Sequence, residues 1–162
     1  NLLCDKEYHL GRGDMSNGIF VAIVLEKAKQ YAGSEENHGL VLRLKAPDMK
    51  IAGYTSLLVN LTKMLKGEES AKQTFGEKFD TFQTFLKTTD KNDLEKFIGL
   101  MHEDMGIFAM FLGYDAIYNE TYPEMAILNR SKITVSQSEY ERICSASKNH
   151  KHGRGELGAT LE

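Results

Sequence analysis

The sequence predicts an α+β fold in which strands near both ends of the chain enclose a helical segment. Short apolar runs with the length and alternation of β-strands occur in the first and last thirds of the 162 residues. Between them, residues 56–112 carry apolar side chains at the three- and four-residue spacing of packed helices. We therefore expect one domain over residues 1–135 with a helical insertion at 56–112. A short helix and a disordered tail are expected over 136–162.

The first third predicts one helix with one strand before it and one strand after it. The runs "GIFVA" at 18–22 and "LVLRLK" at 40–45 are typical of strands. Residues 23–32 lie between them and place Ala28 and Tyr31 on one apolar helical face. This segment is therefore expected to form a strand–helix–strand unit.

The middle of the chain predicts three helices. Ser56 is a candidate N-cap of the first helix, which Gly67 ends. The last of the three runs from a capping segment at 88–90 to Gly113, a residue type that often follows a helix in the left-handed conformation. The methionine and phenylalanine stripes of these helices indicate core packing.

The last third predicts three further strands, at 114–118, 124–129 and 131–135. The polar residues 119–123 form a loop between the first two strands. A short helix is expected over 136–147.

Composition and charge argue against several classes of function. Twenty basic and 23 acidic residues give a net charge of -3, without the basic excess typical of nucleic-acid binders. The longest apolar run, at 19–25, is far shorter than the roughly 20 residues that span a bilayer, and no signal peptide is recognisable. Only two cysteines, Cys4 and Cys144, occur, so a reduced setting is expected and not a disulfide framework.

No metal centre is expected. His102, Glu103 and Asp104 are consecutive, so their side chains point in different directions around a helix and cannot converge on one ion. Cys144 is followed by His150 and His152, but no third residue is evident that would orient a nucleophilic thiol.

Two stretches of the sequence match a known pattern. In "SNGIFVAIVLEKAKQYA" at 16–32, the strand 18–22 is followed by a helix that ends in Ala28-x-x-Tyr31. This stretch resembles the second conserved block of the ADP-ribosyltransferase superfamily, which includes diphtheria toxin and the poly-ADP-ribose polymerases. The spacing of eleven positions from Phe20 to Tyr31 is that of the family.

The second matching stretch is "LGYDAI" at 112–117 followed by "YPEMAILNRSKI" at 122–133. It is similar to the closing segment of the family, a Tyr-x-Glu pattern, a short apolar strand and then Asp or Asn. Glu124 matches the family glutamate that precedes this strand, although Glu120 lies close enough to compete. The stretch is most similar to members in phage head-associated proteins and polymorphic toxins.

The resemblance implies a split β-sheet core and a reaction with NAD. NAD would be cleaved, nicotinamide released, and ADP-ribose transferred to a macromolecular acceptor, expected to be a protein. Glu124 would be the catalytic carboxylate, because a carboxylate stabilises the positive charge that develops on the ribose. Tyr31 and Phe20 would line the nicotinamide pocket, and Gly18 would allow close approach of the backbone to the cofactor.

Two departures from the family pattern bear on this interpretation. Phe20 lacks the hydroxyl group of the family's tyrosine or serine. The family's first block, an aromatic-His-Gly or aromatic-Arg-Gly strand, is matched only by "YHLG" at 8–11, where His9 is the candidate cofactor-binding residue. This segment lies too close to Gly18 to form the first strand without rearrangement, so we expect that strand to lie outside the chain. Tyr122 is not the Glu or Gln of arginine-modifying relatives, which argues against arginine as the acceptor.

Two alternatives remain open. A non-catalytic domain of the same fold could serve as a structural or interaction part of a phage particle or toxin. An NAD glycohydrolase would use the same residues but transfer ADP-ribose to water. In each case the cytoplasm or a phage particle is the expected location.

Overall fold

The computed structural model of the chain describes residues 18–32, 41–149 and 158–161, and it has an α+β fold. Its strands are β1 (Ile19–Ala22), β2 (Val41–Leu44), β3 (Ile51–Gly53), β4 (Ala116–Asn119), β5 (Glu124–Ile127) and β6 (Gly158–Leu161). Its helices are α1 (Leu25–Ala32), α2 (Tyr54–Leu65), α3 (Glu69–Phe75), α4 (Glu77–Thr88), α5 (Lys91–Glu103), α6 (Met105–Leu112) and α7 (Gln137–Asn149). None of the helices in the described residues reaches the length and hydropathy needed to cross a bilayer.

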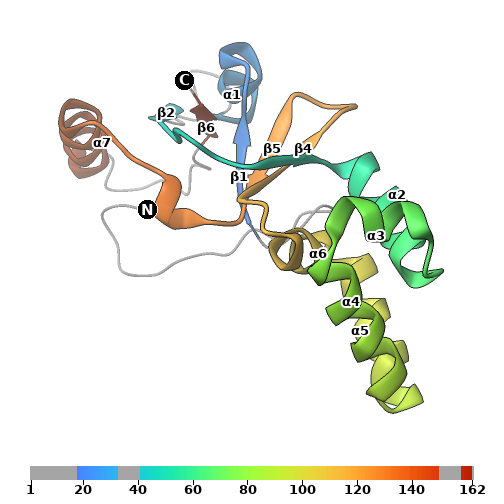
Figure 1. The fold of residues 1–162 in the computed structure, drawn as a ribbon. Helices are drawn as coiled ribbons and strands as arrows, with labels where there is room; N and C mark the ends of the chain where they lie inside the picture. Colours follow the sequence, from blue (N-terminus) through green and yellow to red (C-terminus); the bar gives the residue numbers. More distant parts are fainter. Residues whose placement is uncertain (1–17, 33–40, 150–157, 162) are drawn as a thin grey trace.

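The six strands form one sheet in the order β2-β6-β1-β5-β4-β3 (Figure 1). β5 is antiparallel to both β1 and β4, while β6 is parallel to β1 and β2, and β3 is parallel to β4. The described strands thus form one continuous hydrogen-bonded sheet, and not the split sheet that we expected. Strands from the two ends of the chain are mixed within it, with β6 between β2 and β1 and with β5 beside β1. Helices α2–α6 are inserted between β3 and β4.

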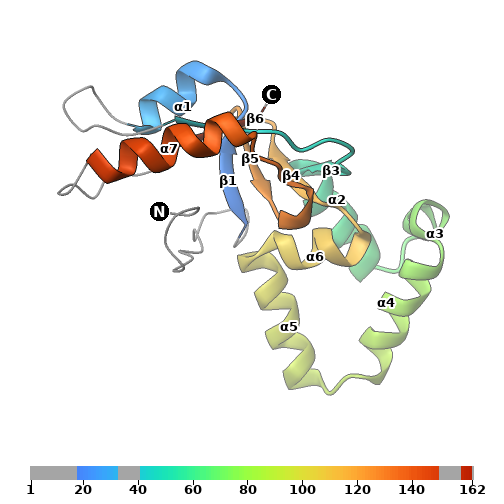
Figure 2. The same cartoon turned by 90° about the vertical axis from the view of Figure 1, so that its left-hand side faces the viewer.

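The sheet separates two apolar clusters because successive strand residues point to opposite faces. On one face, Ile117 and Ala126 are fully buried against α2 and α6. On the other face, Val21 and Ile127 pack with Ile143 of α7. Figure 2 shows the helical insertion extending from one end of the sheet, with α1 and α7 at the other end.

The helical insertion contains five helices, not the three expected. The predicted second helix divides into α3 and α4 at Gly76, whose φ of 51° favours glycine. The predicted third helix divides into α5 and α6 at Asp104, whose carboxylate accepts a hydrogen bond from the backbone N–H of Gly106. The expected cap at Asp90 and the left-handed Gly113 at the end of α6 are both confirmed.

The methionine and phenylalanine stripes form the core of the insertion, as predicted. Phe108 is fully buried, and its ring contacts Phe82 edge-on at a centroid distance of 6.2 Å. Phe85 of α4 contacts Phe97 of α5 at 4.8 Å. Other fully buried side chains around Phe108 are Leu57, Leu61, Met64, Met101 and Met105.

Several predicted boundaries in the last third are wrong. Residues 131–135 do not form a strand, because Asn129 accepts hydrogen bonds from Ser131 and starts a short 3-10 turn at Arg130–Lys132. The predicted short helix is present as α7. Within the expected tail, residues 158–161 form β6 in the sheet.

The carboxylate of Glu120 caps α2 from a distant part of the chain. α2 begins at Tyr54 and not after Ser56. Its N-cap residue Gly53 has no side chain that could accept a hydrogen bond from the first backbone N–H groups of the helix. Glu120 Oε2 accepts hydrogen bonds from the backbone N–H and the hydroxyl group of Thr55, each at 3.1 Å. A methyl group on Gly53 would collide with this carboxylate, so the glycine makes room for the cap. The β4–β5 turn is thereby fixed to the helical insertion.

We expect Glu120→Ala to lower the free energy of unfolding by about 1 kcal/mol at neutral pH, the usual effect of losing an N-cap. Partial desolvation raises the pKa of Glu120, but hydrogen bonds from Thr55 and Ser56 outweigh it and hold the pKa below 4.5. A lowered folded-state pKa makes this contribution fully present above pH 4.5 and lost as the pH falls through the folded-state pKa. Urea unfolding of the variant at several pH values measures both effects. Glu103→Ala, a change of an exposed carboxylate on α5, is the control, and an equal loss in both variants would contradict the cap.

Candidate functional site

The structure brings Tyr31 of α1 and Glu124 of β5 into direct contact. The hydroxyl group of Tyr31 donates a hydrogen bond to Glu124 Oε1, across 93 positions of sequence. The Glu124 side chain is half-buried, while Tyr31 is 46% exposed. The pair therefore lies at the surface where α1 meets the start of β5, and a ligand could reach both groups.

Strand register holds Glu124 in place. Its Cα is paired with Ala22 of β1 on one side and with Asn119 of β4 on the other. The Asn119 side chain also accepts hydrogen bonds from the backbone of Thr121 and Tyr122, which shapes the turn before Glu124. Since directly opposite residues share a face, Glu124 projects from the same face as Ala22.

Tyr31 is held by the packing of α1 on the sheet. Ala28 and Ala32 are the buried residues of this helix, whereas Tyr31 is exposed and Lys27 is half-buried. The Lys27 ammonium lies 5.1 Å from the centroid of the Tyr31 ring, as expected for residues four apart on a helix. The site therefore contains a phenol, a carboxylate and an ammonium group.

The contact between these groups alters the titration of Tyr31. The hydrogen bond to Glu124, together with partial desolvation and the negative charge of that carboxylate, raises the pKa of Tyr31 to about 12. The phenol is protonated at neutral pH and acts as a hydrogen-bond donor, and the raised pKa extends this protonated state to higher pH. A substrate hydroxyl group could replace it as the donor to Glu124.

Glu120, the competing carboxylate, lies in a different environment. It is four residues before Glu124, but its oxygens are directed to the N-terminus of α2. The two acidic residues at the ends of one turn thus bind different partners. This geometry favours Glu124 over Glu120 as the carboxylate of the site.

The other predicted site residues are not gathered around Tyr31 and Glu124. Phe20 is on the same face of β1 as Ala22, about 7 Å along the strand, but its ring packs against the apolar cluster of the helical insertion. Gly18 is buried at the opposite end of β1, about 13 Å along the strand from Ala22. His9 lies outside the described residues. Among the residues the structure describes, the pair Tyr31–Glu124 is what remains of the predicted site.

Lys27 was missed by the sequence analysis. The sequence alone could have indicated Lys27, because a residue four positions before the candidate ring-stacking Tyr31 lies on the same side of the helix. His102, in contrast, lies exposed on α5, and Asp104 beside it is engaged in capping α6. The described residues contain no cluster of three metal-binding side chains.

We expect Glu124→Gln to lower the pKa of Tyr31 from about 12 towards its ordinary value of 10.0, because the charged acceptor is lost. Spectrophotometric titration of the tyrosines measures this shift, and Tyr31→Phe identifies which transition belongs to Tyr31. A raised folded-state pKa also means that the stability due to this bond is present below pH 10 and is lost as the pH rises through about 12. An unchanged tyrosine titration in Glu124→Gln would contradict the contact.

Comparisons of the chain with protein-family models, with curated proteins and with solved structures found no match.

Proposed function

We propose that the chain is an ADP-ribosyltransferase-like domain that cleaves NAD, releases nicotinamide and transfers ADP-ribose to a macromolecular acceptor, expected to be a protein. The observation that carries the proposal is the hydrogen bond between Tyr31 and Glu124. These residues come from two separate blocks of the sequence, and their contact supports the proposal because it places an aromatic ring for nicotinamide beside a carboxylate for the ribose.

Glu124 supplies the electrostatic part of the mechanism. When the bond between nicotinamide and ribose lengthens, positive charge develops on the ribose as an oxocarbenium ion. A fixed carboxylate that accepts a hydrogen bond from an adjacent ribose hydroxyl group stabilises this charge more than it stabilises the ground state. Glu124 suits this role because pairing on both sides of β5 holds its backbone.

Tyr31 supplies the platform for the leaving group. Its exposed ring can stack on the pyridine ring of nicotinamide and orient the bond that breaks. Its hydroxyl group holds Glu124 in position before substrate binds. Tyr31→Phe keeps the ring and removes the donor, whereas Tyr31→Ala removes both, so the two variants separate these contributions.

A second candidate function is a non-catalytic domain that serves as a structural or interaction module of a phage particle or toxin. Phe20 favours it, because the ring predicted to line the nicotinamide pocket packs in the core cluster of the helical insertion. In this case the Tyr31–Glu124 bond would only fasten α1 to the sheet.

Release of nicotinamide from NAD by the chain, followed by chromatography, tests the proposal. We expect Glu124→Gln to lower the rate by about 10²–10³-fold, the usual cost of removing one group that stabilises transition-state charge. Glu120→Gln is the matched control, since this carboxylate caps α2 and leaves the rate within a few-fold of the original. Equal rates for the Glu124 variant and the unmodified chain would contradict the assignment.

Two further outcomes separate the remaining functions. Free ADP-ribose without a labelled protein would identify an NAD glycohydrolase. Absence of both turnover and calorimetric NAD binding in the unmodified chain would favour the non-catalytic module.

A further inference from the structure

Lys27 places a positive charge over one face of the Tyr31 ring. Its ammonium nitrogen lies 5.1 Å from the ring centroid, and the spacing of four residues keeps both side chains on the same side of α1. Lys27 is half-buried, so part of its aliphatic stem is held by its surroundings, while the Tyr31 ring is exposed. A flat ligand that stacks on Tyr31 therefore has the face opposite Lys27 to bind to.

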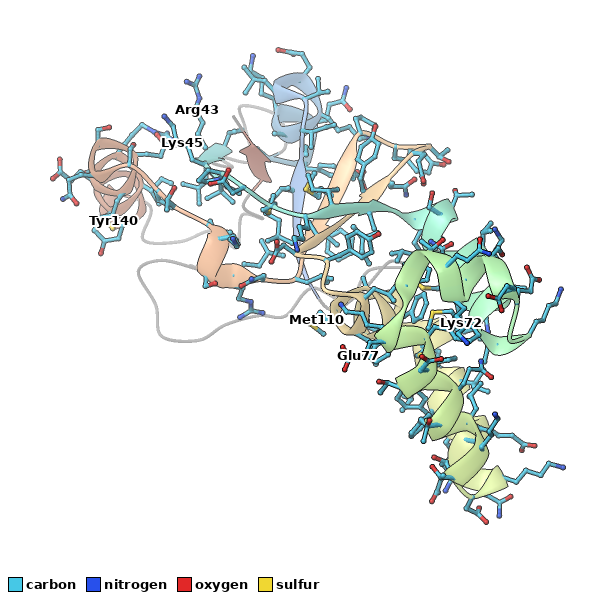
Figure 3. All side chains as sticks on the ribbon, viewed as in Figure 1. Arg43, Lys45, Lys72, Glu77, Met110 and Tyr140 are labelled. Atoms are coloured by element: carbon cyan, nitrogen blue, oxygen red, sulfur yellow. The ribbon has the colours of Figure 1, made fainter. Side chains whose placement is uncertain are left out.

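The charge of Lys27 is not neutralised by a nearby carboxylate. Lys29, the other lysine of α1, is paired with Glu26 at 2.9 Å, but Lys27 forms no ion pair with any carboxylate of the described residues. Glu124 accepts its hydrogen bond from the phenol and not from the ammonium group. Figure 3 shows α1 well away from the charged side chains at the far end of the helical insertion, such as the labelled Lys72. The aromatic ring thus has a cation over one face and an anion at its hydroxyl group.

Cleavage of NAD moves a positive charge in one direction between these two groups. The nicotinamide ring of NAD is a pyridinium cation. As its bond to the ribose breaks, the electron pair of that bond goes to the ring nitrogen, nicotinamide leaves as a neutral molecule, and the positive charge passes to the ribose. No proton moves in this step. A cation beside the ring and an anion beside the ribose therefore favour the same displacement of charge.

We propose that Lys27 repels the bound pyridinium ring of NAD and thereby promotes the departure of nicotinamide, an inference that rests on the proposed function. Offset-stacked rings have centroids at least about 4.5 Å apart, so a ring on the free face of Tyr31 would lie about 10 Å from the ammonium group. Two unit charges at this separation near a protein surface change a binding constant by about two- to tenfold. A neutral ring at the same place would not be repelled.

Calorimetry with NAD and NADH tests the repulsion, because NADH has the same phosphate and ribose groups but a neutral ring. The measurements use the Glu124→Gln background, which slows turnover. We expect Lys27→Met to tighten NAD binding by about threefold at low ionic strength and to leave NADH binding unchanged. Lys27→Arg keeps the charge and should keep both affinities. Lys29→Met is the matched control on the same helix and should alter neither affinity.

Two binding results would overturn the inference. An unchanged affinity for NAD in Lys27→Met would show that no repulsion exists. Equal weakening of NAD and NADH would show that Lys27 instead attracts the phosphate groups that both molecules carry.

Nicotinamide release from NAD gives a second, independent readout. With Glu124 intact, Lys27→Met should lower kcat and KM together, by about two- to threefold, because the variant removes a repulsion that is larger in the bound substrate than in the transition state. The difference should shrink at high ionic strength. An unchanged or raised kcat would contradict the inference. If the unmodified chain binds neither NAD nor NADH and releases no nicotinamide, the proposed function fails as well, whereas binding and turnover without an NAD-specific effect of Lys27 overturn this inference alone.

Discussion

The antiparallel pairing of β1 with β5 is the constraint on which the candidate site depends. It joins a strand from the first third of the chain to one from the last third and sets Glu124 opposite Ala22. α1 begins three residues after Ala22, so the same register determines where Tyr31 meets the sheet. A slip of one residue would turn Glu124 to the face covered by α7, and the contact with Tyr31 would be lost.

The two carboxylates of the β4–β5 turn have different partners. Glu120 is bound by the N-terminus of α2, where the missing side chain of Gly53 leaves room for it. The Glu124 carboxylate accepts a hydrogen bond from the neutral phenol of Tyr31. The helical insertion therefore contributes to the site indirectly, because its first helix holds the turn from which β5 and Glu124 start.

Sequence patterns with a local cause were the ones that could be predicted. The Met and Phe stripes of residues 57–111, the cap at Asp90 and the helix end at Gly113 follow from helical periodicity and backbone preference, and all are present. The breaks at Gly76 and Asp104 were missed because apolar spacing continues across both. β3 was missed because a strand of three residues has too little alternation to be recognised.

Local patterns also explain why the sequence could point to Tyr31 and Glu124 but not to the surroundings of Phe20. Tyr31 and Glu124 belong to patterns of strand, helix and spacing that are visible in the sequence, and the structure brings them together. The surroundings of Phe20 depend on which face of β1 the helical insertion covers, and no local pattern contains that information. The hydrogen bonds from α7 to the edge of β2 are similar, since Glu139 and Arg142 lie about 100 positions from the backbone groups that they bind.

The most direct test of the central claim, that Tyr31 and Glu124 form a nicotinamide-nucleotide site, is an NMR titration of the ring-labelled tyrosines with NAD. We expect the Tyr31 resonances, assigned with Tyr31→Phe, to shift in a saturable way while those of Tyr54 and Tyr140, on other helices, stay unchanged. Tyrosine resonances that do not move at saturating NAD, or that move only on α2 or α7, would contradict the claim.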